Sequence, residues 1–438
     1  MSYSPDSAYN SRSRKIYYKV DIYFDGRTKP PLEITRDNYL ISSSLLEEAT
    51  AGDTPFNNVS SNEVSFTLDS PQRIFNPTNV SSPYYNKMRR GVPVDVFIRC
   101  SEDDEWSPLG NFYVTDWQAT ATTATVVADD VLYNIFGDGE RDLPVRSNYG
   151  VANLYKDFFD LYGIDPEVDA SIIQVLPRSY LNTGNKDFLT QLSIAFFCIC
   201  NVNHDGRVNV LNLRRVKELR QTITDEDQIV DVKVNISLSN NYDAATLVYH
   251  VPQESAPTVL YRQSAVKVPP GILSMNVALQ QSPVSQLRRI SFDADNGNVS
   301  VEKLNASRKT CAFNLVNYTT EEILGNLEIA GRYLETIEGQ LGAAGDNTLE
   351  IESLYIQSPE YAEEFMRNIK AFIQYTNPVL TLTVRGNPNW QIGDKIRVLS
   401  ARHRVDFTGI LTRQSFRYDG GLTSDITLLN HTLVEAGV

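Results

Sequence analysis

The chain has 438 residues, and its 40 Lys and Arg against 54 Asp and Glu give a formal net charge of −14. Aromatic residues make up 10% and apolar residues 42%, which excludes a disordered or low-complexity protein. The acidic balance, with a pI near 4.9, argues against a dedicated duplex-DNA binder, which would carry a basic stripe. The length predicts two to four domains of roughly 100–200 residues each.

Short strands dominate the first 135 residues. Alternating or β-branched runs predict strands over 18–24, 64–68, 92–98, 112–117 and 123–128. Residues 75–85 contain too many Pro, Asn and Ser residues for a regular element and are expected to form a loop. One helical turn over 129–136 would close this part. The pattern predicts a compact antiparallel sandwich or barrel.

A mixed α/β module is expected from about 137 to 228. Apolar residues recur with helical spacing over 153–162 and 186–199, and Gly163 ends the first of these helices. Residues 200–213 read as a hairpin that turns at Asp205-Gly206. Residues 194–200 are predicted to be helical, with Cys198 and Cys200 buried as apolar side chains rather than used as metal ligands.

The stretch from 253 to 376 has one strong element, its last. Ser358 can cap a helix that starts with Pro359, and apolar residues then form one stripe up to residue 373. Residues 321–364 hold eleven acids against one Arg, and the acids up to residue 338 lie in an apparently helical stretch. This acidic segment is either a solvated face or a repulsive surface.

The C-terminal part returns to strands and resembles the N-terminal part. Strands are expected over 379–384, 395–398, 409–412 and 423–429. In each part a Gly (Gly91 or Gly393) precedes a strand, and a second Gly (Gly110 or Gly409) opens the next strand. In each part a polar strand with Thr residues follows, and it ends at Asp129 or Asn430. Antiparallel barrels can share such spacing by chance, and the alternative is two copies of one barrel in one chain.

No motif for catalysis or metal binding is found. The four histidines are His204, His250, His403 and His431, and none has the spacing of a zinc hydrolase. There is no Gly-x-Ser-x-Gly elbow and no phosphate-binding Gly-Lys-Ser/Thr loop. Residues 293–297 are better explained by a hairpin turn than by a calcium loop. We therefore expect no catalytic, cofactor-binding or metal-binding residues, and no enzyme.

Several motifs resemble phage tail proteins. Ser82-Pro-Tyr-Tyr85, Leu109-Gly-Asn-Phe-Tyr-Val114 and Asp129-Asp-Val-Leu-Tyr133 resemble the N-terminal part of siphophage and prophage minor tail proteins. Residues 377–389, Gly393-Asp394 and 409–413 resemble the C-terminal barrel of tail hub proteins in the baseplate-hub superfamily.

The resemblance implies a trimeric structural virion protein at the tail tip, assembled in the host cytoplasm. Such a hub joins the hexameric tail tube to a central spike or fibre and forms part of the DNA exit channel. Its implied partners are further copies of itself, the tail tube or distal tail protein, the spike or fibre protein, and the tape measure protein. Neither sequence-specific nucleic acid binding nor a membrane span is expected. Many hubs carry an enzymatic or fibre domain further on, whereas this chain stops at Val438 after its last strand.

The expected fold is mainly β, with two tube-type antiparallel β-barrel domains and two α/β inserts. The first barrel is assigned to 15–135, and the α/β insert to 136–228. The second barrel is discontinuous, from 229–252 together with 377–438. An α+β insert over 253–376 ends in the amphipathic helix. A distal-tail adaptor ring with one barrel per chain is the main alternative, and a protein that binds or degrades cell-wall glycans is a weaker one.

Two sets of residues are predicted to matter in assembly. The loop at 75–85 is expected either to contact a neighbouring subunit or to pack only on itself. Its candidate interface residues are Phe75, Asn76, Pro77, Tyr84 and Tyr85. The second set would line the channel and repel DNA phosphates, or would form an acidic outer surface. Its members are Glu321, Glu322, Glu328, Glu335 and Glu338.

Overall fold

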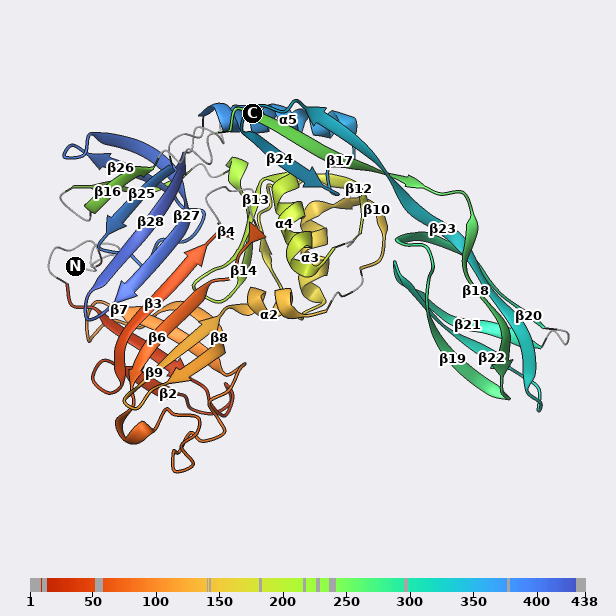
Figure 1. The fold of residues 1–438 in the computed structure, drawn as a ribbon, viewed down its shortest axis with the longest axis horizontal. Coiled ribbons are helices and arrows are strands. Elements are labelled where there is room, and N and C mark those ends of the chain that lie inside the picture. Colours follow the sequence, from red (N-terminus) through yellow and green to blue (C-terminus); the bar gives the residue numbers. More distant parts are fainter. Residues whose placement is uncertain are drawn as a thin grey trace.

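The computed structural model describes residues 9, 14–51, 58–139, 141, 143–180, 183–215, 218–225, 229–235, 242–294, 298–375 and 379–430. These residues are mostly β, and Figure 1 shows three regions in a row. A large sheet built from both ends of the chain lies on the left, a helical module lies in the middle, and a β arm projects on the right. No helix within the described ranges is long and apolar enough to cross a membrane.

The N-terminal strands form one half of the large sheet. They are β1 (Tyr17–Ile22), β2 (Leu32–Thr35), β3 (Leu40–Glu48), β6 (Glu63–Asp69), β7 (Pro93–Arg99), β8 (Ser107–Ala119) and β9 (Thr123–Asp129). They pair antiparallel in the order β3-β6-β9-β8-β7-β1-β2. Alternate residues of β6, namely Val64, Phe66 and Leu68, are buried, which confirms the period of two seen in the sequence. The short strands β4 (Thr50–Ala51) and β5 (Asn58–Val59) pair with each other, and the 3-10 helix η1 (Pro71–Arg73) precedes the predicted loop.

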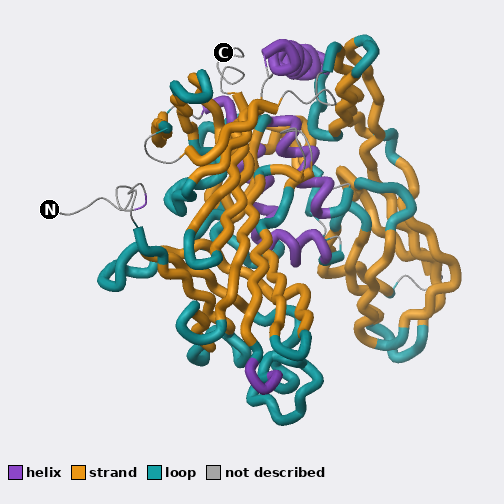
Figure 2. Tube along the Cα trace, turned by 60° about the vertical axis from the view of Figure 1, so that its left-hand side comes forward, coloured by secondary structure: helices purple, strands orange, loops and turns teal. Residues whose placement is uncertain are grey.

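Two strands from the middle of the chain and four C-terminal strands form the other half. They are β15 (Leu219–Thr224), β16 (Ile229–Asn235), β25 (Val379–Val384), β26 (Lys395–Ser400), β27 (Val405–Tyr418) and β28 (Leu422–Asn430). Their order is β16-β25-β28-β27, and β26 pairs with both β27 and β15. Because β27 also pairs with β3, the two halves form a single 13-stranded sheet. Figure 2 shows the long strands of this sheet side by side, with the helices beside them.

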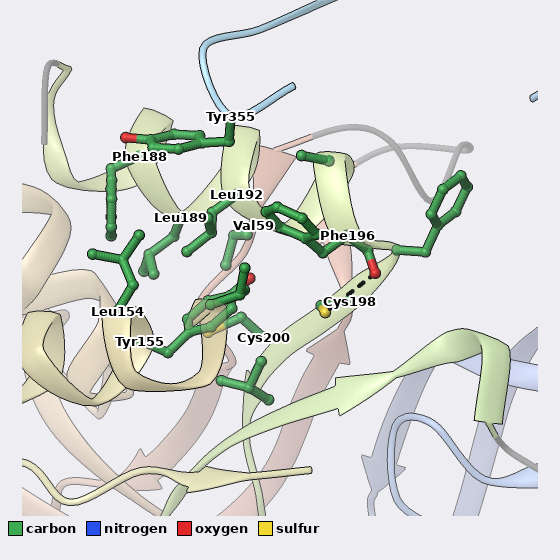
Figure 3. Packing of buried hydrophobic residues seen from close by; sticks show 14 of the residues in the cluster. Val59, Leu154, Tyr155, Phe188, Leu189, Leu192, Phe196, Cys198, Cys200 and Tyr355 are labelled. Atoms are coloured by element: carbon green, nitrogen blue, oxygen red, sulfur yellow. Dashed lines mark hydrogen bonds between the residues drawn. The ribbon is translucent and has the colours of Figure 1, made fainter. Parts of the chain in front are cut away.

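The middle of the molecule is an α/β module that ends earlier than the predicted bound of 228, because β15 pairs with β26 in the large sheet. Its elements are α2 (Val131–Gly137), β10 (Arg146–Gly150), α3 (Val151–Asp160), β11 (Glu167–Val168), β12 (Val175–Ser179), α4 (Asn185–Phe196), β13 (Cys198–Val202), β14 (Val208–Asn212) and η2 (Leu213–Arg215). β13 and β14 form the expected hairpin, and Gly206 takes φ +76 in its turn. Figure 3 shows the core of this module, where Tyr155 of α3 and Phe188 and Phe196 of α4 belong to one cluster with Cys198 and Cys200 of β13.

The predicted helix over 194–200 is wrong in its second half. α4 ends at Phe196, because Phe197 adopts the left-handed conformation (φ 53) and turns the chain. Cys198 and Cys200 therefore lie on β13, where pairing with β14 satisfies the backbone. Both cysteines are buried, and Figure 3 places them beneath the aromatic residues of α4.

The arm is all β. Its strands are β17 (Ala244–Glu254), β18 (Thr258–Val268), β19 (Gly271–Ala278), β20 (Val284–Ala294), β21 (Val299–Ala306), β22 (Thr310–Asn317), β23 (Ile323–Gly342) and β24 (Thr348–Ser353). β23 pairs with β18 and β20 far out in the arm and then with β17 near the module. Residues 244–252, which the sequence assigned to the second barrel, thus belong to β17 and pair with β23 and β24 instead of the large sheet.

The acidic stretch predicted to be helical is also a strand. In the first half of β23 every second residue is buried, including Ile323, Leu327 and Ile329. This period of two fits a strand with one face on a core, and the strands that flank β23 supply its hydrogen bonds. Tertiary pairing has overridden a local preference for helix at the glutamates.

The amphipathic helix α5 (Pro359–Tyr375) is confirmed, and it packs on the module. The hydroxyl of Ser358 accepts a hydrogen bond from the amide of Tyr361 at 3.1 Å, as in an N-cap. Phe365 lies 5.1 Å from Phe197 between ring centroids, and the Tyr361 hydroxyl donates to the carbonyl of Ala195 at 2.6 Å. The stretch 253–376 is therefore divided between the arm and the module core.

Candidate functional site

The described residues hold no cluster suited to metal binding. No group of three or more His, Cys, Asp or Glu in the described ranges could hold a metal ion. His204 and His250 are each near one carboxylate, of Glu47 and of Glu352, at 2.8 and 3.1 Å. His431 lies outside the described residues. Burial raises the pKa of the Cys198 thiol to about 12, so at neutral pH it is protonated and a poor nucleophile.

The most informative site is the repeated hairpin of the large sheet. Gly91 and Gly393 both have positive φ, +82 and +98. The amide of Gly91 donates to the carbonyl of Val114 at 2.7 Å, and that of Gly393 donates to Leu411 at 2.8 Å. The reverse bonds also match, from Val114 to the carbonyl of Val92 at 2.9 Å and from Leu411 to that of Asp394 at 2.8 Å. The sequence similarity around these glycines thus corresponds to the same backbone hydrogen-bond pattern.

The repeat extends to a bulge in the following strand. The register shifts between Val114 and Asp116 in β8, and between Leu411 and Arg413 in β27. The residue in each bulge is a threonine, Thr115 or Thr412. The hydroxyls of these threonines donate to the carbonyls of Val127 and Thr427, both at 3.3 Å. Because bulges interrupt the ladder at defined points, a shared bulge with a shared hydrogen bond is a strong sign of one repeated design.

Strand order completes the correspondence. We define the first unit as β3-β6-β9-β8-β7 and the second unit as β16-β25-β28-β27-β26, two series that pair antiparallel throughout. They differ at the outer end, where β1 is antiparallel to β7 but β15 is parallel to β26. The N-terminal strands, and β16 together with the C-terminal strands, thus form the same five-stranded pattern.

The two units are joined along one line, the seam, where residues 413–418 of β27 pair with residues 43–48 of β3. The seam is extended by a hydrogen bond from the amide of Ala49 to the carbonyl of Thr412, at 2.7 Å. Phe416 and Tyr418 of the second unit are buried in the hydrophobic core of the first unit, and Tyr418 stacks on Tyr18 at 4.9 Å. The seam is a buried joint and not a surface contact.

A buried ion pair lies at the seam. Glu47 is opposite Gln414 in the register, and its Oε1 lies 2.8 Å from Nε2 of His204 in the module hairpin. Burial alone would lower the pKa of His204, but the Glu47 carboxylate outweighs it, so the pKa of His204 is raised. In this way the module is fixed to the sheet where its two halves meet.

The candidate interface loop is partly packed within its own chain. Phe75 is fully buried, and its ring stacks on Tyr84 at 5.6 Å. The carbonyl of Phe75 accepts from Nε1 of Trp117 at 3.0 Å, which ties the loop to β8. Asn76 is buried and Pro77 is half-buried, whereas Tyr85 keeps 38% of its surface exposed. Tyr85 is therefore the aromatic residue of the loop best placed for a contact with another molecule.

The five candidate acids lie along the arm. Glu328 pairs with Arg262 at 2.6 Å and Glu322 with Lys267 at 3.5 Å, both across to β18. Glu321, Glu335 and Glu338 are exposed. The arm stands apart from the large sheet in Figure 1, so these acids are not brought together with the seam.

Sequence reasoning found the repeated glycines but missed the seam. One signal for it is present in the sequence. Apolar residues continue to alternate up to Phe416 and Tyr418, beyond residue 410, where the pairing of β27 with β26 ends. Alternation indicates that a strand is half-buried, but it does not identify the partner strand.

Comparison with known proteins places the fold. No family model matches the chain, and no curated protein matches its sequence. The 43 kDa tail protein of prophage MuSo2 from Shewanella oneidensis superposes with a TM-score of 0.53 at 10% identity, over 95% of this chain and 99% of that one. A tail protein from Neisseria meningitidis MC58 gives 0.54 at 9% identity, over 94% of this chain and 96% of that one. The chain has the fold of these tail proteins along nearly its whole length, as the sequence resemblance predicted.

Proposed function

We propose that this chain is a structural protein of a phage tail tip: a hub of three copies that joins the hexameric tail tube to the central spike or fibre. The fold that it shares with prophage tail proteins supports a place in the virion tail. In this role its work is mechanical, since it connects proteins and surrounds part of the path by which DNA leaves.

The observation that carries the proposal is the repeat joined at the seam. One chain holds two similar five-stranded units side by side in one sheet. Three such chains present six similar units, which is what a threefold tip needs in order to meet a sixfold tube. The two predicted tube-type barrels are, in this proposal, these two units, each closed by its neighbours in the ring.

The remaining regions suit contacts away from the ring. The arm extends to one side of the large sheet, so it would reach the distal tail protein, the spike or fibre, or the tape measure protein. The five candidate acids on the arm would then form an acidic outer surface instead of a channel lining, and two of them, Glu322 and Glu328, pair with cations of β18 within the arm.

Native mass spectrometry of the purified full-length chain tests the stoichiometry. We expect a homotrimer, and raising the salt concentration should leave it intact because backbone pairing is not screened as surface charges are. A hexamer would instead favour a distal-tail adaptor ring. A chain that stays monomeric both alone and with its tail partners would contradict both roles.

A further inference from the structure

We propose that one face of the arm binds a neutral, β-linked glycan of the host cell wall. This inference goes beyond the proposed role in the tail tip and does not depend on the trimer. It rests on the contrast between the two outer faces of the arm, on an exposed tyrosine whose hydroxyl is held in place, and on the hydrogen-bonding groups beside that tyrosine.

The face belongs to the three-stranded sheet β19-β22-β21. Leu273, Leu315 and Val301 of these strands pack in the hydrophobic core of the arm. Because side chains alternate along a strand, the residues next to them point outward. The outward residues form two cross-strand rows, Ile272–Val316–Ser300 and Ser274–Asn314–Glu302. Glu302 is the only charged residue in these two rows, which together with Tyr318 we call the Tyr318 face.

The opposite face of the arm, on β18 and β23, is charged. Its ion pairs join Arg262 to Glu328 at 2.6 Å and Lys267 to Glu322 at 3.5 Å. Such a charged face is typical of a surface that stays in water. The Tyr318 face instead exposes 63% of Ile272 among small, uncharged polar residues. This combination is typical of recognition surfaces, where Tyr supplies contact area and Ser and Asn supply hydrogen bonds.

Tyr318 follows β22 and gives the face an aromatic plane. The residue is 70% exposed. Its phenol hydroxyl donates to the Glu302 carboxylate at 2.7 Å and accepts from the Ser300 hydroxyl at 3.3 Å, so the side chain is tied to β21. Because the ring is already held, it loses little conformational entropy when a ligand stacks on it.

Hydrogen-bonding groups lie beside this side chain. The Ser274 hydroxyl donates to Oδ1 of Asn314 at 2.9 Å, and Asn314 is opposite Glu302 in the register. Within the described residues nothing accepts a hydrogen bond from the Asn314 NH2 group, so this donor is available to a ligand. The face therefore offers an amide donor, a hydroxyl and a carboxylate acceptor close to an aromatic plane.

A sugar matches these groups. Its hydroxyls both donate and accept hydrogen bonds, and a β-linked pyranose presents a flat surface of C–H groups that can pack on an aromatic ring. A single carboxylate with no cation in either row disfavours anionic polymers such as DNA. The arm stands apart from the large sheet (Figure 1), so a glycan bound there would not compete with contacts of the sheet.

A ligand-observed NMR titration of the purified full-length chain tests this surface, with the β-1,4-linked tetramer of N-acetylglucosamine as the probe. The natural chain should bind the tetramer. Tyr318→Ala should weaken binding about tenfold, because the aromatic plane is lost. Asn314→Ala removes the amide donor and should weaken binding about threefold. Tyr318→Phe keeps the ring and should bind more tightly than Tyr318→Ala.

A matched variant on the opposite face makes the outcome decisive. Leu324 is opposite Lys267 and 56% exposed, so Leu324→Ala should bind the tetramer as the natural chain does. If the natural chain does not bind the tetramer, or if Tyr318→Ala binds it equally well, the inference is overturned and the proposed tail-tip role is unaffected. A trimer that shields Tyr318 from oxidative labelling and binds no tetramer would show that the face contacts another protein, which also overturns the inference.

Discussion

The two units of the large sheet share a glycine-initiated hairpin, a threonine bulge and a strand order, but they differ in what lies on their edges. In the first unit the edge strand β3 is covered by β27 of the same chain. In the second unit β16 has β25 on one side and no second paired strand among the described residues. The difference shows that, among the described residues, one of the two equivalent strands is paired on both sides and the other on one side.

The units also differ in the strand beyond their hairpins. β1 follows the N-terminal segment and runs antiparallel to β7, whereas β15 leaves the module and runs parallel to β26. The direction of this outer strand depends on the connection that supplies it, while the five-stranded pattern inside stays the same. The repeat therefore resides in the paired core strands and not in the segments that lead to them.

The largest effect is expected from breaking the seam core. Phe416→Ala removes a ring that is 1% exposed and packs in the core of the first unit, so it should lower the free energy of unfolding by roughly 3–5 kcal/mol. Phe407→Ala, on the same strand but only half-buried and outside the seam, should cost less. Denaturant unfolding of both variants measures this. A Phe416→Ala chain within about 1 kcal/mol of the natural one would contradict a buried seam.

The ion pair at the seam should give a pH-dependent contribution. The pKa of His204 is higher in the folded chain than its unfolded value of about 6.5, so the stabilisation from protonation is complete below that pH and is lost as pH rises through the folded pKa. Glu47→Gln removes the carboxylate that favours the buried imidazolium, so the variant should lose roughly 3 kcal/mol at pH 6. The cost should be smaller at pH 9.

Urea unfolding of the natural chain and of Glu47→Gln at both pH values measures this difference. Asp130, whose pKa burial raises to about 7, titrates in the same range but is present in both chains, so it cancels. A cost that is equal at pH 6 and pH 9 would show that the pair does not depend on the charge of His204.

A smaller effect separates the two tyrosines of the loop. Tyr84 stacks between Phe24, at 4.8 Å, and Phe75, so Tyr84→Ser should lower stability by roughly 1–2 kcal/mol. Tyr85→Ser should change stability by less than about 0.5 kcal/mol but weaken the trimer, as judged by native mass spectrometry after dilution. If Tyr85→Ser leaves trimer dissociation unchanged, the loop packs only on its own chain.

No effect at all is expected in an assay for hydrolysis. Zymography of the purified chain on host peptidoglycan should give no lytic band, because the role proposed for the chain is to connect other tail proteins. A lytic band that persists through repurification would show a catalytic site and contradict a purely structural role.

Local patterns predicted much of this fold. The alternation in β6, the capped stripe of α5 and the Asp205-Gly206 hairpin each depend on neighbouring residues, and each is confirmed. The acids of β23 and the segment after Phe196 were misassigned because helical spacing or helix-favouring residues locally outweighed the pairing that the folded chain supplies.

The candidate site was only partly predictable. Gly91 and Gly393 could be found because a positive φ restricts the residue type to one that is visible in sequence. The seam could not, since residues 43–48 and 413–418 lie at opposite ends of the chain and pair through backbone groups that every residue has. The buried contact of Glu47 with His204 depends on that pairing and could not be predicted before it was known.

The most direct test of the account is a reconstruction of the intact tail tip without imposed symmetry. We expect three copies of this chain in a closed ring of six similar units. Six copies in the ring, or a single copy, would contradict the central claim that one chain supplies two of the six units.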